Sequence, residues 1–187
     1  MGSLRVWLFR ISVLAVAGLM LLSWFMPWWS CDIEALFVED AAIIHPYGLE
    51  VNQTVTGYLE KFSEMPGYFA PLIWLYLGLF LSAILIGVWI KDKSIGLFGR
   101  QFNLSKLIIG IAGFSYILVV VLAMVIAAIR TGEAGLDLLG RTFVVMGTEE
   151  ASWISARLLW GYWLACAVGP ILIVLALLRN KIVGKAN

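Results

Sequence analysis

The sequence predicts an all-α integral membrane protein: a four-helix transmembrane bundle with a small extracytoplasmic cap between the first two spans. Of the 187 residues, 62% are hydrophobic and only 13% are charged. A soluble domain is instead about half apolar and about a quarter charged. The apolar residues are also gathered into four long runs, so we expect residues 1–187 to form a single membrane domain.

Each apolar run is long enough to be a spanning helix, since about 20 helical residues cross the roughly 30 Å of hydrocarbon in a bilayer. The expected spans are residues 6–26, 70–90, 107–129 and 158–178. The first run follows a basic N-terminus and ends at Pro27 and Trp28. It lacks the small residues of a cleavage site, so we expect an uncleaved signal anchor. Arg10 lies one turn inside this span and can extend its side chain to the nearer interface.

The distribution of basic residues predicts the orientation, because Lys and Arg are enriched in cytoplasmic flanks. One set of flanks holds nine of the thirteen Lys and Arg but only one acidic residue, Asp92. The opposite flanks hold the other four basic residues and eleven acidic ones. We therefore expect both termini and the inner loop 91–106 in the cytoplasm. The outer segments 27–69 and 131–156 are expected on the extracytoplasmic side.

The first outer segment is too long for a simple connector and shows partial alternation of apolar residues. Residues 33–38 and 49–55 are the expected strands of a small β-hairpin or sheet that caps the bundle, and the His-Pro-Tyr-Gly sequence at 45–48 predicts a turn. Residues 58–65 are compatible with one or two helical turns. The second outer segment is apolar enough to lie on the membrane surface or to pack under the first.

The last span contains small residues at every fourth position, a pattern that lets helix backbones approach closely. The pattern is formed by Gly161, Ala165 and Gly169. It predicts a helix-packing face, with a chance spacing as the alternative. Pro170 predicts a kink, because its ring nitrogen cannot donate a hydrogen bond to the carbonyl of Cys166.

Tryptophans gather near the expected outer interface, where amphipathic rings commonly anchor membrane proteins. The expected anchors are Trp24, Trp28, Trp29, Trp74 and Trp153. For Trp28, Trp29 and Trp74 the alternative is a slot that holds a quinone or a lipid.

Residues of metal-binding type also occur on the outer side. The weak candidates are Cys31, Asp32 and His45, with Glu34 and Asp40 beside them, and a cysteine ligand would suit copper. Their spacing matches no ligand motif, so a hydrated acidic surface is favoured. A single histidine cannot supply the two axial ligands of a membrane b-type haem.

Residues 52–54, Asn-Gln-Thr, form a glycosylation sequon. Asn52 lies on the expected outer side, so the predicted topology permits glycosylation in an organism with the machinery.

In layout the chain resembles tetraspan proteins of the claudin and PMP22 type, which have four spans, inner termini and a larger first outer segment that begins rich in tryptophan. Here that segment begins Trp28-Trp29-Ser30-Cys31. Claudin-like proteins carry two cysteines in this segment after a Trp-Gly-Leu-Trp-like motif, whereas this chain has only Cys31 there. The resemblance therefore implies a layout and carries no residue role.

The expected spans hold no ionisable side chain except Arg10, whereas proton relays and ion-coupled transporters normally need such groups. We expect a non-catalytic accessory or structural subunit of a larger membrane protein complex, hetero- or homo-oligomeric. No resident cofactor and no nucleic-acid partner are expected, and lipids should bind at the surface. Two alternatives stay open: a redox or metal/quinone-associated subunit with a site at the outer interface, and a small oligomeric channel or transporter.

Overall fold

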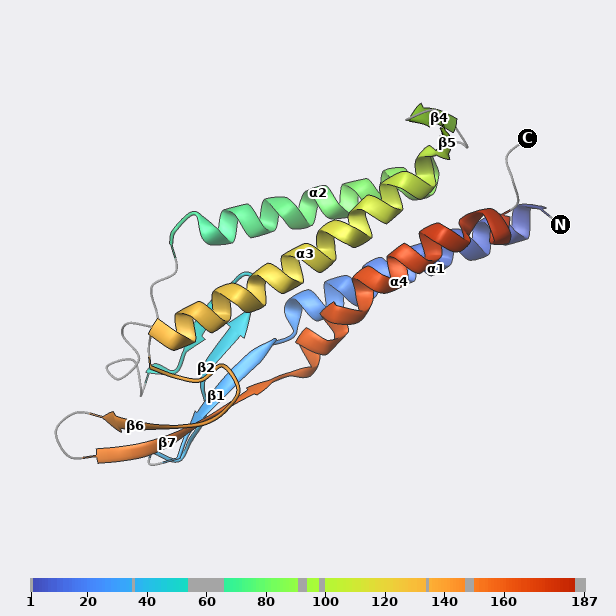
Figure 1. The fold of residues 1–187 in the computed structure, drawn as a ribbon. Coiled ribbons are helices and arrows are strands. Elements are labelled where there is room, and N and C mark those ends of the chain that lie inside the picture. The colour runs from blue at the N-terminus through green and yellow to red at the C-terminus, as the bar shows by residue number, and fades with distance from the viewer. Residues whose placement is uncertain are drawn as a thin grey trace. The chain divides into compact units, whose positions relative to one another are not determined.

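The structure is a computed structural model that describes residues 2–34, 36–53, 66–90, 94–97, 100–133, 135–146 and 150–183. Its long helices are α1 (Gly2–Phe25), α2 (Phe69–Trp89), α3 (Leu104–Glu133) and α4 (Trp160–Val183) (Figure 1). All four are long and apolar enough to cross a membrane. This confirms the predicted candidate spans and indicates a multi-pass membrane protein.

Helix α3 extends beyond the predicted span at both ends. It begins at Leu104 instead of 107 and ends at Glu133 instead of 129. Asn103 caps its first turn by accepting a hydrogen bond from the backbone nitrogen of Lys106 at 3.3 Å. Its last turn contains Arg130 and Glu133, whose charged atoms lie 3.4 Å apart. Hydropathy alone misses such polar helix ends. In α4 the helix continues through Pro170.

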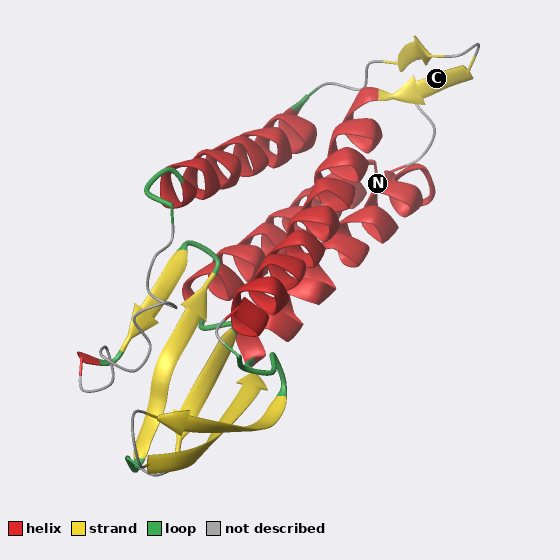
Figure 2. Cartoon of the chain, turned by 60° about the vertical axis from the view of Figure 1, so that its left-hand side comes forward, coloured by secondary structure: helices red, strands yellow, loops and turns green. Residues whose placement is uncertain are grey.

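A five-stranded antiparallel sheet is formed by strands from two separate parts of the sequence. The strands are β1 (Trp29–Ile33), β2 (Val38–His45), β3 (Gly48–Val51), β6 (Gly140–Met146) and β7 (Glu150–Leu158), in the order β3-β2-β1-β7-β6 (Figure 2). A second, two-stranded sheet pairs β4 (Ser94–Leu97) with β5 (Arg100–Asn103).

The large sheet corrects the predicted all-α class and the predicted hairpin. Residues 33–38 and 49–55 do not pair with each other, because β2 lies between β1 and β3. The predicted turn at 45–48 is present and joins β2 to β3. The second outer segment forms β6 and β7, and pairing of β7 with β1 satisfies backbone groups of both strands. The helical turns expected at 58–65 lie outside the described residues.

The chain divides into two compact units. The first comprises Met1–Leu21, Leu75–Val119 and Leu164–Asn187, and contains helices and the β4–β5 hairpin. The second comprises Leu22–Trp74 and Val120–Trp163, and contains the five-stranded sheet and one end of each long helix.

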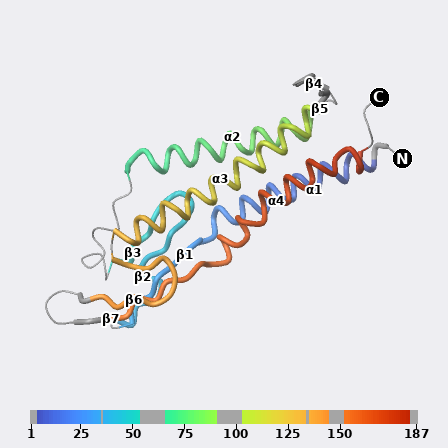
Figure 3. Tube along the Cα trace, in the orientation of Figure 1, coloured from blue at the N-terminus to red at the C-terminus, as the bar shows by residue number. Residues whose placement is uncertain are grey.

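Within the first unit the helices contact one another in sequence order, and α4 lies beside α1 (Figure 3). Helix α1 contacts α2 through Trp7 and Trp89, and α2 contacts α3 through Tyr76 and Ser115. Helix α3 contacts α4 through Gly113 and Gly169, and α4 contacts α1 through Arg179 and Phe9. The α3–α4 contact is a backbone approach. A Cβ atom added at Gly169 would lie 2.5 Å from Cγ1 of Ile117 and 2.9 Å from the carbonyl oxygen of Gly113.

The second unit has its core on one face of the five-stranded sheet. The buried core residues are Trp29, Cys31, Ile33, Ala41, Ala42, Leu136, Ile154 and Ala156. Leu136 belongs to the segment between α3 and β6. Trp29 fastens this segment by donating a hydrogen bond from Nε1 to the carbonyl of Leu138 at 2.6 Å. The segment therefore packs against the sheet.

Substitution of Gly169 by alanine is expected to destabilise the first unit, because the new methyl group would overlap Ile117 and the α3 backbone. Such overpacking typically costs about 1–3 kcal/mol. The melting temperature of the purified protein in one detergent measures the effect. Gly78→Ala is the matched control, since a Cβ atom there meets nothing within 4 Å and alanine favours helix. Equal melting temperatures for G169A and G78A would contradict the close α3–α4 approach.

Candidate functional site

A pocket of the second unit lies where the last turns of α3 meet the β2–β3 hairpin. It has a volume of about 60 Å³. Its walls are Trp28, Trp29, Ile44, His45, Pro46, Leu49, Phe69, Ala123, Met124, Ile126, Ala127 and Arg130. Ten of these twelve residues are apolar, and the two that can carry charge, His45 and Arg130, are both basic. Small-molecule pockets share this composition, apolar with a few polar groups, but are usually larger, about 300–1,000 Å³.

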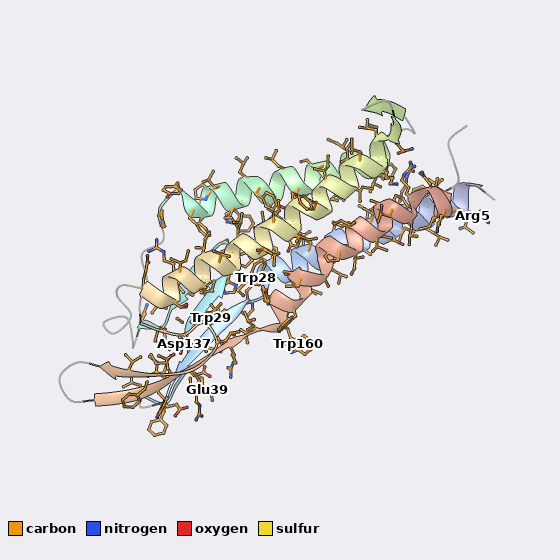
Figure 4. The ribbon with its side chains drawn as sticks, viewed as in Figure 1. Arg5, Trp28, Trp29, Glu39, Asp137 and Trp160 are labelled. Atoms are coloured by element: carbon orange, nitrogen blue, oxygen red, sulfur yellow. The ribbon has the colours of Figure 1, made fainter. Side chains whose placement is uncertain are left out.

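The two tryptophans of the pocket, Trp28 and Trp29, lie at the junction between the end of α1 and the start of β1, and hydrogen bonds at this junction position them (Figure 4). The backbone nitrogen of Trp28 donates to the carbonyl of Ile44 at 2.9 Å, and its own carbonyl accepts from Leu159 at 2.9 Å. Its Nε1 donates to the carbonyl of Ser23 at 2.9 Å, and Nε1 of Trp29 donates to Leu138. Both indole N–H groups are therefore satisfied outside the pocket, so the rings supply apolar wall.

A glycine allows this junction to form. The hydroxyl of Ser23 near the end of α1 donates to the carbonyl of Gly161 in α4 at 2.8 Å. A Cβ atom at Gly161 would lie 2.5 Å from the carbonyl oxygen of Pro27 and 2.9 Å from Cβ of Met26. No larger residue fits at Gly161 without a shift of the backbone that precedes β1.

An aromatic stack orients His45. Its ring lies 5.1 Å from that of Tyr47 with 16° between the planes, and Tyr47 stacks on Trp74 at 5.5 Å and 26°. Trp74 in turn contacts the ring of Trp24 at 6.4 Å. The His45 side chain is only 11% exposed, and its Nε2 lies 3.8 Å from Glu50. Among the described residues no hydrogen-bond partner reaches its buried Nδ1, so this atom is available to a ligand.

Arg130 supplies the second basic group of the pocket wall. It lies in the last turn of α3, where the helix dipole favours a cation. Its only ion pair among the described residues is the exposed contact with Glu133 at 3.4 Å, and exposed pairs of this kind are weak. The guanidinium can therefore exchange this partner for an anionic or carbonyl-bearing ligand at little cost.

The three tryptophans of the predicted quinone or lipid slot do not all line one pocket. Trp28 and Trp29 line the pocket, whereas Trp74 acts through Tyr47 and His45. Of the expected anchors, Trp24, Trp28 and Trp29 are buried inside the second unit. Trp74 and Trp153 are exposed. Sequence reasoning missed Tyr47, Phe69 and Arg130 as parts of a site. The sequence signal for close packing at the pocket was the spacing of Ala123 and Ala127 by four residues on α3.

The structure does not assemble the metal candidates. Cys31 lies in the sheet core and is 1% exposed. Asp32 binds Arg157 at 3.2 Å and accepts a hydrogen bond from the backbone of Asp40 at 2.8 Å. His45 belongs to the aromatic stack. No three His, Cys, Asp or Glu side chains within the described ranges are grouped so as to hold a metal. Neighbouring strand residues point to opposite faces, which separates Cys31 from Asp32.

The pKa of the Cys31 thiol is raised from 9.0 to about 11, mainly by burial and in smaller part by the carboxylates of Asp32 and Asp40, and against the lowering effect of a backbone hydrogen bond at Ala42. The thiol is therefore neutral at physiological pH. A neutral thiol is a poor metal ligand, because the thiolate is the form that binds.

The predicted packing residues contact different neighbours. Gly161 meets the backbone before β1 in the second unit, and Gly169 meets α3 in the first. Ala165, between them, is buried. Asn52 is exposed, and its backbone nitrogen donates to the carbonyl of Ala41 at 2.9 Å. Thr54 of the sequon lies outside the described residues.

The face of the sheet opposite the core carries charge pairs. Arg141 of β6 lies 2.9 Å from Glu34, which also accepts a hydrogen bond from Ser155 at 3.2 Å. Arg157 of β7 bridges Asp32 at 3.2 Å and Asp40 at 3.6 Å. Arg141 thus links β6 to the residue that follows β1, and Arg157 links β7 to both β1 and β2.

Two exposed aromatic rings interrupt this charged face. Phe143 and Trp153 form a cross-strand pair between β6 and β7. Their ring centroids lie 5.1 Å apart, edge to face. Residues on one strand face recur at every second position, so Phe143 shares its face with Arg141 and Trp153 shares its face with Arg157.

Comparisons of the chain with protein-family models, with curated proteins and with solved structures found no match. The function of the protein must therefore be inferred from its own side chains.

The Cys31 thiol should resist alkylation by iodoacetamide at pH 8 in folded protein and react after denaturation. A pKa of about 11 in place of 9.0 lowers its thiolate fraction about a hundredfold. Because the folded state holds the thiol proton more tightly than the unfolded state, Cys31 makes its full contribution to stability below pH 9. This contribution is lost as the pH rises towards 11. The experiment uses a Cys166→Ala background and mass spectrometry. Rapid labelling of Cys31 in the folded protein would show that the sheet core is open.

Proposed function

We propose that the protein is a non-catalytic accessory subunit of a larger membrane protein complex, and that a partner subunit docks on the charged face of the five-stranded sheet. In this proposal both termini are cytoplasmic and the sheet lies on the outer side, as the basic residues predict. The observation that carries the proposal is the exposed pair Phe143 and Trp153. Their exposed fractions are 54% and 46%.

The composition of this face supports a docking role. Aromatic residues and arginine are enriched in the centres of protein interfaces, and a polar rim usually surrounds them. Here the aromatic pair is adjacent in register to Arg141 and Ser155, because Phe143 pairs with Trp153 and Arg141 pairs with Ser155. A partner that covered the two rings would remove their apolar surface from water, and this burial would favour association.

The turn between β1 and β2 carries a further exposed aromatic residue, Phe37. Phe37 is 95% exposed and adopts a φ of 52°. A bulky residue rarely occupies this left-handed region, because its side chain crowds the backbone there. The neighbouring Leu36 packs against the sheet core. The turn therefore anchors one apolar side chain and presents the other, an arrangement suited to contact with a second protein.

Purification in mild detergent at native expression should yield an assembly larger than the 20.7 kDa chain. The double variant Phe143→Ser/Trp153→Ser should reduce the recovered partner about tenfold or more, since hot-spot residues contribute at least about 2 kcal/mol each. Native-gel mobility and quantitative mass spectrometry measure both results.

Trp160→Ser is the matched control, because Trp160 is also an exposed aromatic residue but lies at the start of α4 outside the sheet (Figure 4). It should leave partner recovery unchanged. A monodisperse monomer from native membranes would overturn the proposal.

A second candidate function is a quinone-associated redox subunit, and the pocket lined by Trp28, Trp29 and His45 favours it. The free Nδ1 of His45 and the guanidinium of Arg130 are suitable hydrogen-bond donors to quinone carbonyls. Organic extraction and an ultraviolet spectrum of the purified protein test this candidate. A stoichiometric quinone that is lost in His45→Leu would support it, and quinone-free protein from quinone-containing membranes would reject it. The channel or transporter alternative remains a hypothesis that a liposome flux assay can test.

A further inference from the structure

An apolar groove of about 290 Å³ lies on the first unit, between the start of α3 and the end of α4. This volume is close to the lower end of the range for ligand pockets, about 300–1,000 Å³. Seven of the eight residues that line the groove are apolar, and the eighth is Lys106. Both helices are apolar enough to cross a membrane. A polar occupant would lose its hydrogen bonds to water there, so the groove favours an apolar one.

The groove has a floor of small residues and a rim of long side chains. Ala176 of α4 is buried, and a Cβ atom added at Gly110 of α3 would lie 3.7 Å from the Cβ of Ala176. The rim residues are each more than half exposed, namely Ile111, Phe114 and Leu177. A helix is about 10 Å across with its side chains, so this rim keeps the backbone of a partner helix away from the floor. A single hydrocarbon chain is slender enough to reach it.

Helices α3 and α4 run antiparallel along the groove. Gly110 faces Ala176, and a Cβ atom added at Gly113 would lie 3.0 Å from the Cβ of Leu172. Later positions of α3 therefore face earlier positions of α4. It follows that the first turn of α3 and the last turn of α4 lie at the same end of the groove.

Each of these two turns carries a lysine. Lys106 lies in the first turn of α3 and lines the groove. Lys181 is exposed, lies in the last turn of α4 and follows Leu177 by four residues, on the same face of the helix. Helical side chains lean toward the N-terminus of their helix, so Lys181 leans back toward the groove. The ion pairs of the described residues include neither lysine, which leaves both ammonium groups available to an anion.

We propose that the groove holds one acyl chain of an anionic phospholipid and that Lys106 and Lys181 bind its phosphate. The ammonium group of lysine is a common phosphate ligand, with three N–H donors. A phospholipid joins an anion to an apolar chain, which is the combination that two lysines at the end of an apolar groove complement. In the orientation proposed above, this end lies at the cytoplasmic leaflet, where anionic lipids are concentrated.

This proposal differs from general attraction between basic residues and an anionic membrane surface. Such attraction is shared among all Lys and Arg near the surface. A groove with two lysines at one end instead predicts one stoichiometric site that depends on those lysines and on the open space at Gly110. The site lies in the first unit, so it does not depend on the proposed docking of a partner on the sheet of the second unit.

Native mass spectrometry of the delipidated full-length protein, titrated with phosphatidylglycerol or phosphatidylcholine, measures the contribution of charge. The wild-type protein should bind one phosphatidylglycerol, about tenfold more tightly than phosphatidylcholine. Lys106→Gln and Lys181→Gln should each weaken phosphatidylglycerol binding about fivefold. Arg5→Gln is the matched control, because it removes a charge from an exposed residue of α1 that does not line the groove. It should change binding less than about twofold.

Gly110→Leu measures the contribution of the groove in the same titration, because its side chain would occupy the space of the acyl chain. Each displaced methylene group lowers affinity about fourfold. The variant should therefore bind both lipids at least about tenfold more weakly and keep its preference for phosphatidylglycerol. Gly78→Leu is the matched control, since a Cβ atom there meets nothing within 4 Å. It should bind as the wild type does.

A phosphatidylglycerol with a diazirine in its acyl chain tests the location on the wild-type protein and needs no variant to fold. Irradiation should give adducts in residues 107–114 and 173–177. Three results would overturn the proposal: equal affinity for the two lipids, an R5Q loss as large as that of K181Q, or adducts spread evenly over the four helices. A benzophenone amino acid at position 111, irradiated in native membranes, should label lipid. A dominant protein adduct would show that a partner helix covers the groove and that the lipid proposal is wrong.

Discussion

The second unit depends on the junction at which α1 ends and the chain enters the sheet. Proline cannot donate a backbone hydrogen bond, and after Pro27 the next residue already pairs with Ile44 and Leu159. The ring of Trp28 then donates back to the carbonyl of Ser23, and Ser23 donates to Gly161. The helix end, the start of β1 and the start of α4 are therefore tied together at this point.

This junction also explains how the pocket is formed. The backbone at Trp28 is held from both sides, and the indole rings of Trp28 and Trp29 line the pocket together with residues of the β2–β3 hairpin. The hairpin in turn carries His45, whose ring is fixed by Tyr47 and Trp74. A basic group is thereby held at the edge of an apolar wall, in a part of the sequence that is otherwise acidic. Substitutions at Gly161 should disturb the pocket as well as the helix contact, because both depend on the same backbone.

The helices could be predicted from the sequence because each is a local property of an apolar run. The sheet could not, since β1 pairs with residues more than one hundred positions away, such as Cys31 with Ala156. Exposed Phe143 and Trp153 also mask the alternation of β6 and β7, so the second outer segment looked mixed and apolar enough to lie on the membrane surface. For the pocket, the tryptophans were identifiable as a cluster. Arg130 was not, because only the fold brings the last turn of α3 to His45.

The central claim is that a partner protein covers the aromatic pair of the sheet. A benzophenone amino acid incorporated at position 143 and irradiated in native membranes tests it most directly, because the probe reacts only with atoms in contact. The account predicts one dominant protein adduct from position 143. A probe in place of the exposed Trp160 should not give this adduct. Adducts to lipid alone, or no adduct from position 143, would contradict the claim.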